Sequence, residues 1–313
     1  MKTAILMMAY GGPDSLDDIE PYLLDVRGGR PTSPELVEEI RARYAQIGGR
    51  SPLLAITRAQ AEQLEERLHA EFAGQISVYV GMRHWKPYIA DVVKQIAADG
   101  NARLVGLCMA PHASRYSTGA YRKKLEEALK ALAQPLPLYF IESWHNHPLF
   151  IRTIVENVQA ELAHFTAEER HQVHFLFSAH SLPSAILEQG DPYPAQLEET
   201  ARQAAAQLGL RPEQWSLCYQ SAGRIPGAWL GPQIDEVIPQ LAARGVRHAL
   251  VAAIGFVADH VEVLYDLDIE AKCQAERHGI TLRRAASPNT APLFIEALAQ
   301  IVTSSMEKEP ETL

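Results

Sequence analysis

The sequence predicts an α/β protein with two Rossmann-like lobes, in which helices flank parallel four-stranded sheets and a ligand cleft lies between the lobes. Along the 313 residues, short apolar runs alternate with longer amphipathic stretches, the pattern of parallel sheets covered by helices. A strand–helix–strand pattern occurs in each half of the chain. The length also favours two domains of roughly 150 residues each.

The predicted strands are mostly apolar or β-branched and end at a small or polar residue, as buried parallel strands do. They are Ala4–Met8, Ser77–Gly81, Leu104–Met109, Leu138–Ile141, His174–Ser178, Ala249–Ile254 and Ile280–Arg284. Amphipathic periodicity predicts helices at Pro34–Ile47, Leu54–Phe72, Pro87–Asp99, Gly119–Leu132, His147–Ala163, Pro194–Leu208, Gln233–Ala243, Val261–His278 and Ala291–Ser304.

The two halves repeat the same local signal. Gly100 and Gly245 each follow a predicted helix and precede a predicted strand, as glycines that end helices do. We therefore place a first lobe at residues 1–144 and a second lobe at residues 145–285. We expect residues 286–313 to hold a C-terminal helix that packs back on the first lobe.

The composition argues against several classes of protein. A net charge of -9 disfavours a nucleic-acid partner, since phosphate binding needs a basic surface. No apolar run approaches the roughly 18 residues that a membrane span requires. Cys108, Cys218 and Cys273 stand far apart, so neither a disulfide framework nor a four-cysteine metal cluster is expected. We expect a cytoplasmic monomer without a transmembrane segment.

Chemically active side chains follow the predicted strands where these strands end. Tyr10 follows the first predicted strand, His112 the third, His180 the fifth and His260 the sixth. Ligands of parallel α/β sheets bind beyond the carboxyl ends of the strands, so these side chains are expected to converge on one rim. A lone histidine in such a place is more often a hydrogen-bonded structural residue. The case for His180 therefore depends on its neighbours.

An acidic series follows the sixth strand. Glu262, Asp266 and Glu270 are spaced by four residues, so a regular helix would place their carboxylates on one face. Like charges at this spacing cost a helix roughly 0.2–0.5 kcal/mol per pair. One interpretation is a solvated surface face. The other is a path of carboxylates for a divalent cation, which leads from solvent toward His180.

Several common catalytic motifs are absent from the sequence. It contains no nucleophile elbow, zinc-protease helix motif, Walker A loop or dinucleotide-binding glycine motif after a strand. The turn after Tyr10 cannot serve as a phosphate cradle, because Pro13 lacks the N–H donor that such a loop uses. A histidine and a carboxylate with a path for metal remain as the candidate site.

The motifs together resemble those of ferrochelatases, over nearly the whole chain. The Ser-Ala-His-Ser-Leu-Pro run around His180 and the His-x-Glu-x-x-Tyr-Asp element that begins at His260 are the most specific. The matching segments are Tyr10–Pro13, Arg43–Tyr44, Gly48–Leu53, Ser178–Pro183, Gly190–Tyr193, Trp229–Pro232 and Gly255–Asp266. This resemblance implies a chelatase-like fold and a porphyrin site, with Fe²⁺ and a porphyrin as substrates and release of two protons in haem biosynthesis.

The resemblance also assigns roles to residues. His180 and Glu262 would form the catalytic pair and contact the metal, and Asp266 and Glu270 would line a metal or proton path. Tyr10 would be an axial ligand to the product iron, as in the branch that acts on coproporphyrin III. Residues that would contact the tetrapyrrole or its propionates are Tyr10, Arg27, Arg43, Tyr44, Ser51 and Tyr121.

The resemblance has limits. Gly119-Ala120 before Tyr121 and Ala222 after Ser221 depart from the family pattern, which weakens the assignment of the porphyrin-facing loops. The iron–sulfur cluster of some members needs four cysteines, and none follows Cys273, so no such cluster and no tightly bound cofactor is expected. Partners would be the porphyrin, Fe²⁺ and a downstream enzyme of the haem pathway. His84 and His112 stay outside the list of predicted site residues.

Other functions stay open at this point. The enzyme could act on protoporphyrin IX instead of coproporphyrin III. A cobalt or nickel chelatase would share the architecture, but such enzymes usually place two histidines at the metal. A haem carrier could keep the fold without turnover, although a carrier has no need of a proton path.

Overall fold

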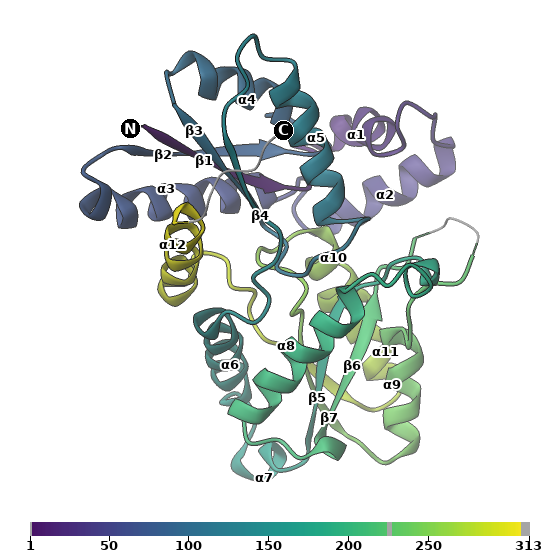
Figure 1. Cartoon of the computed structure of the whole chain (residues 1–313). Helices are drawn as coiled ribbons and strands as arrows, with labels where there is room; N and C mark the ends of the chain where they lie inside the picture. The colour runs from purple at the N-terminus through teal and green to yellow at the C-terminus, as the bar shows by residue number, and fades with distance from the viewer. Residues whose placement is uncertain (1, 224–226, 308–313) are drawn as a thin grey trace. The chain divides into compact units, whose positions relative to one another are not determined.

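The computed structural model describes residues 2–223 and 227–307 of the chain (Figure 1). These residues form two compact units. The first unit holds the chain up to Ala110, then Arg115–Trp144, and finally the segment that begins at Asn289. The second unit holds His145–Pro288 together with the short segment Pro111–Ser114.

The first unit is built on a parallel four-stranded sheet with the order β2-β1-β3-β4. The central strand β1 is buried along its whole length, because helices cover both faces of the sheet. The strands are β1 (Thr3–Ala9), β2 (Ile76–Met82), β3 (Arg103–Cys108) and β4 (Leu138–Ile141). All four were predicted, with ends shifted by at most one residue.

Helices α4 and α5 pack on one face of this sheet, and α3 and α12 pack on the other. The predicted cap at Ser33 is confirmed, since its hydroxyl accepts a hydrogen bond from the Leu36 N–H at 3.3 Å. The short helix α1 was not predicted. The helical segments of this unit are η1 (Leu16–Asp18), α1 (Ile19–Val26), α2 (Pro34–Gln46), α3 (Leu53–Phe72), α4 (Ile89–Ala98), α5 (Thr118–Lys130) and α12 (Pro292–Met306).

The second unit repeats the topology with the strand order β6-β5-β7-β8, again all parallel. Its strands are β5 (Val173–His180), β6 (Trp215–Gln220), β7 (His248–Ala252) and β8 (Thr281–Arg284). Strand β6 was not predicted. Its first half is only partly buried and mixes polar with apolar side chains, so it lacks the continuous apolar run of a central strand.

The core of the second unit lies on both faces of its sheet. Side chains of β5, β7 and β8 pack with α9, η4 and α11 on one face, and α6 contacts β7 while α8 contacts β6. The helical segments are α6 (Pro148–Leu162), α7 (Ala167–Arg170), η2 (Ser184–Ile186), α8 (Tyr193–Gln207), η3 (Pro212–Gln214), α9 (Ile234–Ala243), α10 (Val261–Leu264), η4 (Asp266–Ala271) and α11 (Lys272–Arg277).

The single regular helix predicted at Val261–His278 is wrong. The chain forms one α-helical turn, then the π-helix η4, and then α11. The π-helical hydrogen bond runs from the Glu270 N–H to the Tyr265 carbonyl at 2.9 Å, five residues back. A π-helical turn holds more residues than an α-helical turn, so a spacing of four no longer places side chains on one straight face.

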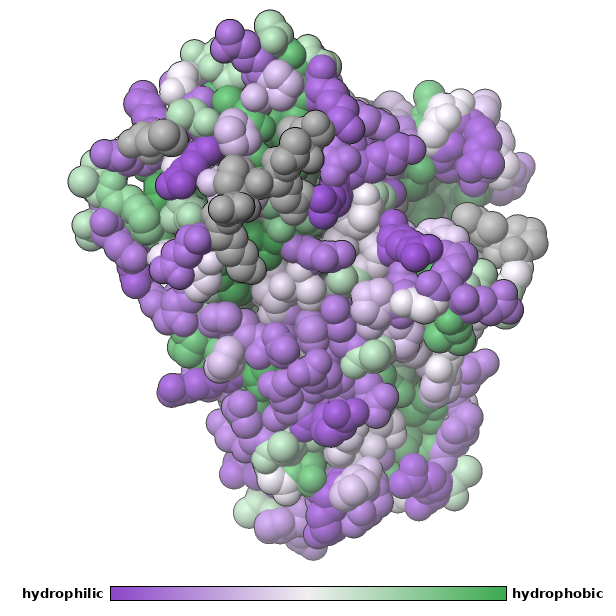
Figure 2. All heavy atoms as spheres, in the orientation of Figure 1, coloured by the Kyte–Doolittle hydropathy of each residue, from purple (hydrophilic) through white to green (hydrophobic). Residues whose placement is uncertain are grey.

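Among residues 2–223 and 227–307, no helix combines the length and the apolar character needed to cross a bilayer. The face of the molecule in Figure 2 carries mainly hydrophilic side chains, with smaller hydrophobic areas between them.

Candidate active site

The sheet topology places the candidate residues at a position typical of ligand sites. In the second unit, β5 is followed in sequence by β6 on one side, and β7 and β8 lie on the other. The order of the strands therefore reverses between β5 and β7. In open parallel sheets, ligands bind outside the carboxyl ends of the two strands between which the order reverses. His180 is the last residue of β5, and the loop after β7 leads to Glu262.

A close packing contact fixes this loop against β5. A Cβ atom on Gly255 would lie 2.8 Å from the Cβ atom of Ala179, the residue before His180. The Gly255 N–H also donates a hydrogen bond to the Ser178 carbonyl at 3.3 Å. Glycine is required here because the two backbones approach more closely than a side chain allows.

His180 and Glu262 face each other within the second unit. The Nε2 atom of His180 lies 3.5 Å from Oε1 of Glu262, and the two side chains are 30% and 32% exposed. The Nδ1 atom of His180 contacts the carbonyl of Ser181, so Nδ1 carries a hydrogen and Nε2 is directed at the carboxylate. The Tyr193 hydroxyl donates to the His180 carbonyl at 2.9 Å and holds the strand end in place.

The two side chains shift each other's protonation. Burial lowers the pKa of the His180 imidazole, but the Glu262 carboxylate, together with the Ser181 carbonyl and Asp266, more than offsets this effect and raises that pKa above its ordinary value. Burial acts to raise the pKa of Glu262, yet His180 and His260 hold it well below its usual range. The substrate-free pair therefore favours imidazolium and carboxylate more strongly than the two isolated groups would.

A second histidine contacts the same carboxylate. His260 Nε2 lies 3.4 Å from Oε2 of Glu262, and its Nδ1 lies 3.1 Å from the Ala258 carbonyl. The ring of Phe256 packs edge-on against the His260 ring, with centroids 4.4 Å apart. Glu262 thus has one histidine at each carboxylate oxygen. His260 lies in one of the motifs found in the sequence but was not among the predicted site residues.

Residues at the end of β6 anchor the acidic segment. The Gln220 side-chain amide donates to the Glu262 carbonyl, and its oxygen accepts from the Ser178 hydroxyl at 2.7 Å. The Ser221 hydroxyl donates to the Asp266 carboxylate. Ser221 has φ = 58°, a left-handed conformation that is uncommon outside glycine and often occurs at functional sites. These anchors were missed because β6 itself was missed.

The acidic series divides by exposure. Asp266 is buried, with a relative exposure of 9%, and it contributes to the raised pKa of His180. Glu270 is exposed to solvent. The π-helix therefore carries a buried carboxylate near the histidine and an exposed one further along.

In the first unit, the residues around Tyr10 include several of the predicted porphyrin contacts. A Cβ atom on Gly12 would lie 2.5 Å from the Ser51 side chain and 3.7 Å from the Tyr44 hydroxyl. The Ser51 N–H donates to the Pro13 carbonyl at 2.9 Å. The turn after β1 therefore packs directly on Ser51 and Tyr44, and both of these side chains are buried.

Tyr10 itself is 38% exposed and lies among cationic and aromatic groups. The Arg83 guanidinium lies 5.8 Å from the Tyr10 ring centroid and 5.5 Å from that of Tyr121. The His84 ring lies 4.7 Å from the Tyr10 ring, and His84 Nδ1 is 2.8 Å from Asp25 Oδ1. Burial lowers the pKa of His84 to about 4, even though Asp25 opposes this shift.

The remaining predicted residues occupy separate places. Arg27 is exposed directly after α1, and Arg43 in the last turn of α2 pairs with Glu39 at 3.2 Å. His112 is buried in the second unit, where its Nε2 lies 2.9 Å from the Thr200 hydroxyl. His112 is thus a buried structural residue, and the prediction that it joins the other histidines on one rim is wrong.

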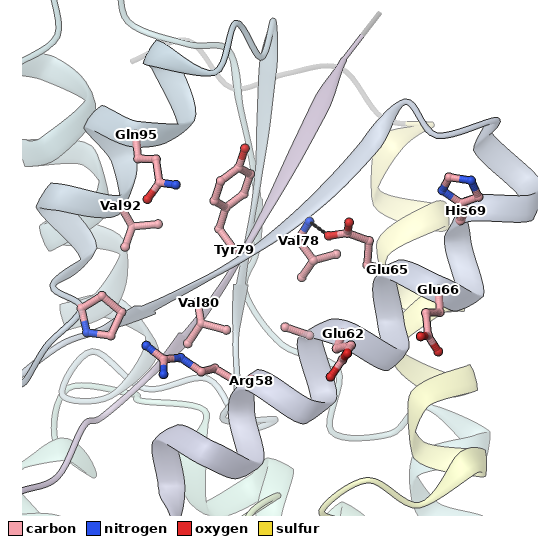
Figure 3. A pocket seen from close by; sticks show the side chains of 12 residues that line it. Arg58, Glu62, Glu65, Glu66, His69, Val78, Tyr79, Val80, Val92 and Gln95 are labelled. Atoms are coloured by element: carbon pink, nitrogen blue, oxygen red, sulfur yellow. Dashed lines mark hydrogen bonds between the residues drawn. The ribbon is translucent and has the colours of Figure 1, made fainter. Parts of the chain in front are cut away.

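The cavity in Figure 3 lies elsewhere in the first unit, along the outer edge of β2. It has a volume of about 590 Å³ and is lined by side chains of α3 and α4 together with β2 (Figure 3). Glu65 accepts a hydrogen bond from the Val78 N–H at 2.6 Å, so a helix carboxylate covers part of this strand edge. None of the predicted site residues lines the cavity, and the candidate site remains at the strand ends.

The sequence model of the ferrochelatase family matches residues 2–306. The chain belongs to the ferrochelatase family. Enzymes of this family insert iron into a porphyrin, so the chain is a lyase of this class. It is 44% identical to a ferrochelatase of Herpetosiphon aurantiacus over 302 residues, 96% of this chain and 98% of the relative. It is 43% identical to a coproporphyrin III ferrochelatase of Geobacillus kaustophilus over 311 residues, 98% of each chain.

Solved structures support the fold. A sirohydrochlorin chelatase, SirB from Bacillus subtilis in complex with cobalt, superposes with a TM-score of 0.59 over 98% of this chain and 96% of that chain, at 9% identity. CbiX, described as the terminal enzyme of siroheme biosynthesis in denitrifying bacteria, has a TM-score of 0.51 at 13% identity, with 97% of this chain and 99% of that chain covered. The predicted chelatase-like fold, with two parallel four-stranded sheets, is confirmed.

Proposed function

We propose that the protein inserts Fe²⁺ into coproporphyrin III, giving coprohaem III with release of two protons. The pair of His180 and Glu262, 3.5 Å apart at the carboxyl end of β5, carries this proposal. It offers one imidazole nitrogen and one carboxylate, a ligand set that suits a divalent first-row metal. A pair of side chains leaves most coordination positions of the iron free for exchange with the porphyrin nitrogens.

Tyr10 supports coproporphyrin III as the porphyrin. Its ring is partly exposed at the end of β1, and its phenol oxygen would bind the product iron as an axial ligand. Coproporphyrin III carries more propionates than protoporphyrin IX, and arginine forks pair well with carboxylates. Arg27 and Arg43 would bind such propionates, while Tyr44, Ser51 and Tyr121 would support the macrocycle. Relatives named coproporphyrin III ferrochelatase favour this choice, although other relatives are named only ferrochelatase.

Insertion requires proton transfer as well as metal transfer. Two pyrrole N–H protons must leave, and each needs an acceptor close to the macrocycle. His180 favours the imidazolium form while Glu262 is unoccupied, so it must first lose a proton. Incoming Fe²⁺ bound to Glu262 would remove the charge that stabilises the imidazolium. His180 Nε2 would then accept one pyrrole proton, or bind the metal first, and Glu262, once it has passed the metal on, would accept the other proton.

The acidic segment would connect this pair with solvent. Asp266, buried beside Ser221, would take protons from the pair, and Glu270 would pass them to water or deliver the metal in return. We further propose that the enzyme works in the cytoplasm as a monomer, holds no resident cofactor or iron–sulfur cluster, and delivers its product to a downstream enzyme of the haem pathway.

Anaerobic Fe²⁺ insertion, followed by absorbance with coproporphyrin III and protoporphyrin IX in parallel, tests this proposal. A higher kcat/KM for coproporphyrin III supports it, and Tyr10→Phe should then weaken binding of the product without abolishing insertion. A higher kcat/KM for protoporphyrin IX would contradict the use of Tyr10 as a marker of the substrate. Insertion of Co²⁺ or Ni²⁺ only, or tight haem binding without any insertion, would contradict the ferrous activity itself.

A further inference from the structure

A largely buried arginine joins two acidic residues on either side of the candidate catalytic segment. Arg284 is the last residue of β8, and its side chain is 14% exposed. Its Nε and Nη2 donate to the two carboxylate oxygens of Asp268 at 2.6 and 2.8 Å. Its Nη1 donates to Asp259 Oδ1 at 3.3 Å, and the Ser287 hydroxyl donates to the same oxygen at 2.7 Å.

The two partners of Arg284 flank the residues that carry the proposed chemistry. Asp259 directly precedes His260 in the loop after β7, and Asp268 lies inside the π-helix. The segment between them contains Glu262 and Asp266. One guanidinium therefore fixes both ends of this segment to the edge strand of the sheet.

The segment needs such a support because its own helical structure is short and irregular. Helix α10 has one turn, Val261–Leu264, and the π-helix that follows is a rare form usually confined to a single turn. Gln220 anchors the middle of the segment through the Glu262 carbonyl. Arg284 supplies the anchors at the two ends.

The contact with Asp268 depends on the shape of the guanidinium as well as on its charge. Burial acts to lower the pKa of Arg284, but Asp268 and Asp259 raise it, so the group stays charged. Two parallel hydrogen bonds from a planar fork to one carboxylate fix both distance and orientation. A lysine would keep the charge and lose the fork, which separates the two effects.

We propose that Arg284 is a positioning residue for metal insertion, which holds residues 259–268 so that Glu262 stays opposed to His180. This inference rests on the proposed function of that pair. Misplacement of a reacting group by about 1 Å can cost about 100-fold in rate, even when the change lies away from the chemistry. Loss of the fork should therefore lower kcat more than it changes porphyrin binding.

The neighbouring residue provides a matched control. Arg283 precedes Arg284 in the same strand, and successive side chains of a strand point to opposite faces of the sheet. Arg283 pairs with Glu161 of α6 at 2.6 Å, away from the acidic segment. Arg283→Lys likewise replaces a carboxylate-paired guanidinium of the same strand by an ammonium and should leave insertion unchanged.

The experiment uses three variants: Arg284→Lys, Asp268→Asn, and the double variant that combines these two changes. Each is compared with the control Arg283→Lys. Anaerobic Fe²⁺ insertion into coproporphyrin III is measured well below the melting temperature of each variant. We expect Arg284→Lys and Asp268→Asn each to lower kcat by about 10- to 100-fold with KM changed less than about 2-fold. The double variant should lose little more than either single variant, because both remove the same contact.

A second measurement on the substrate-free protein separates this inference from the proposed function. The imidazole ¹⁵N signals of His180 and His260 should shift in Arg284→Lys and stay unchanged in Arg283→Lys. Unchanged signals together with wild-type kcat in Arg284→Lys would overturn the positioning role while leaving the function intact. Failure of the wild-type protein to insert any metal would overturn the function, and the imidazole signals would still decide the role of Arg284.

Discussion

Replacement of Glu262 by glutamine removes the charge that the structure places opposite His180. At 3.5 Å, a unit charge pair interacts by about 5 kcal/mol at an effective dielectric constant of about 20, and by about 1 kcal/mol in water. Each side chain is about one-third exposed, so solvent screening favours the lower part of this range, about 1–2 kcal/mol. Glutamine keeps the size and hydrogen-bonding capacity of the side chain and removes only the charge.

The first expected result of Glu262→Gln is a fall in the pKa of His180, because burial then acts on the imidazole without the opposing carboxylate. NMR titration of the His180 imidazole in the substrate-free protein measures this pKa, with Glu270→Gln as a control that removes an exposed carboxylate from the same segment. An unchanged or higher pKa of His180 in Glu262→Gln would refute the electrostatic coupling.

The same variant should show a pH-dependent loss of stability. The raised pKa of His180 contributes stability below its unfolded pKa of about 6.5, and this contribution is lost as pH rises through the folded value. The lowered pKa of Glu262 contributes stability above the pKa of about 4.3 that this group has in the unfolded chain. This contribution is lost as pH falls through the pKa of the folded state. Urea unfolding should therefore find Glu262→Gln more destabilised at pH 6 than at pH 9. An equal loss at both values would contradict the account.

Three further predictions concern other parts of the fold. Burial lowers the pKa of both His84 and His174 to about 4. The free energy of unfolding should therefore fall by up to about 3 kcal/mol per histidine as pH drops from 6.5 toward 4. A free energy of unfolding that stays constant over this pH range in urea titrations would contradict this prediction. Gly255→Ala should lower insertion activity and should lower the free energy of unfolding by about 1–3 kcal/mol, because the new Cβ would lie 2.8 Å from the Cβ of Ala179. A calorimetric scan equal to that of the wild type would count against this packing. Ser221→Gly removes the strain of the positive φ and Ser221→Ala keeps it, while both variants lose the hydrogen bond to the Asp266 carboxylate. Equal losses of kcat in the two variants are expected, and normal activity in the glycine variant would assign the effect to backbone strain instead.

Much of the fold could be predicted because apolar periodicity determines it locally. Strands such as β1 and β5 are continuous apolar runs buried on both faces, and the helices on either side of them are amphipathic. Strand β6 was missed because its first half is partly exposed and mixes polar with apolar side chains, and helix α1 was missed because it is short and partly exposed. The π-helix could not be predicted, since its i to i−5 hydrogen bonds follow from packing on neighbouring elements and not from a pattern of residue types.

The candidate site was predictable only in part. His180 and Glu262 were found because strand ends and motif spacing point to them. The roles of Gln220, His260 and Arg284 arise from contacts between residues far apart in sequence, such as the 42 positions between Gln220 and Glu262. The raised pKa of His180 likewise depends on a tertiary distance, and no spacing in the sequence specifies it.

The central claim is that His180 and Glu262 carry out metal insertion, and single-turnover kinetics of His180→Ala tests it most directly. Coproporphyrin III binding is first measured by fluorescence quenching, and anaerobic Fe²⁺ is then mixed with the preformed complex. We expect porphyrin affinity close to wild type and an insertion rate lower by about 100-fold or more, in line with loss of a general base. Wild-type insertion from an equally well-folded His180→Ala protein would contradict it.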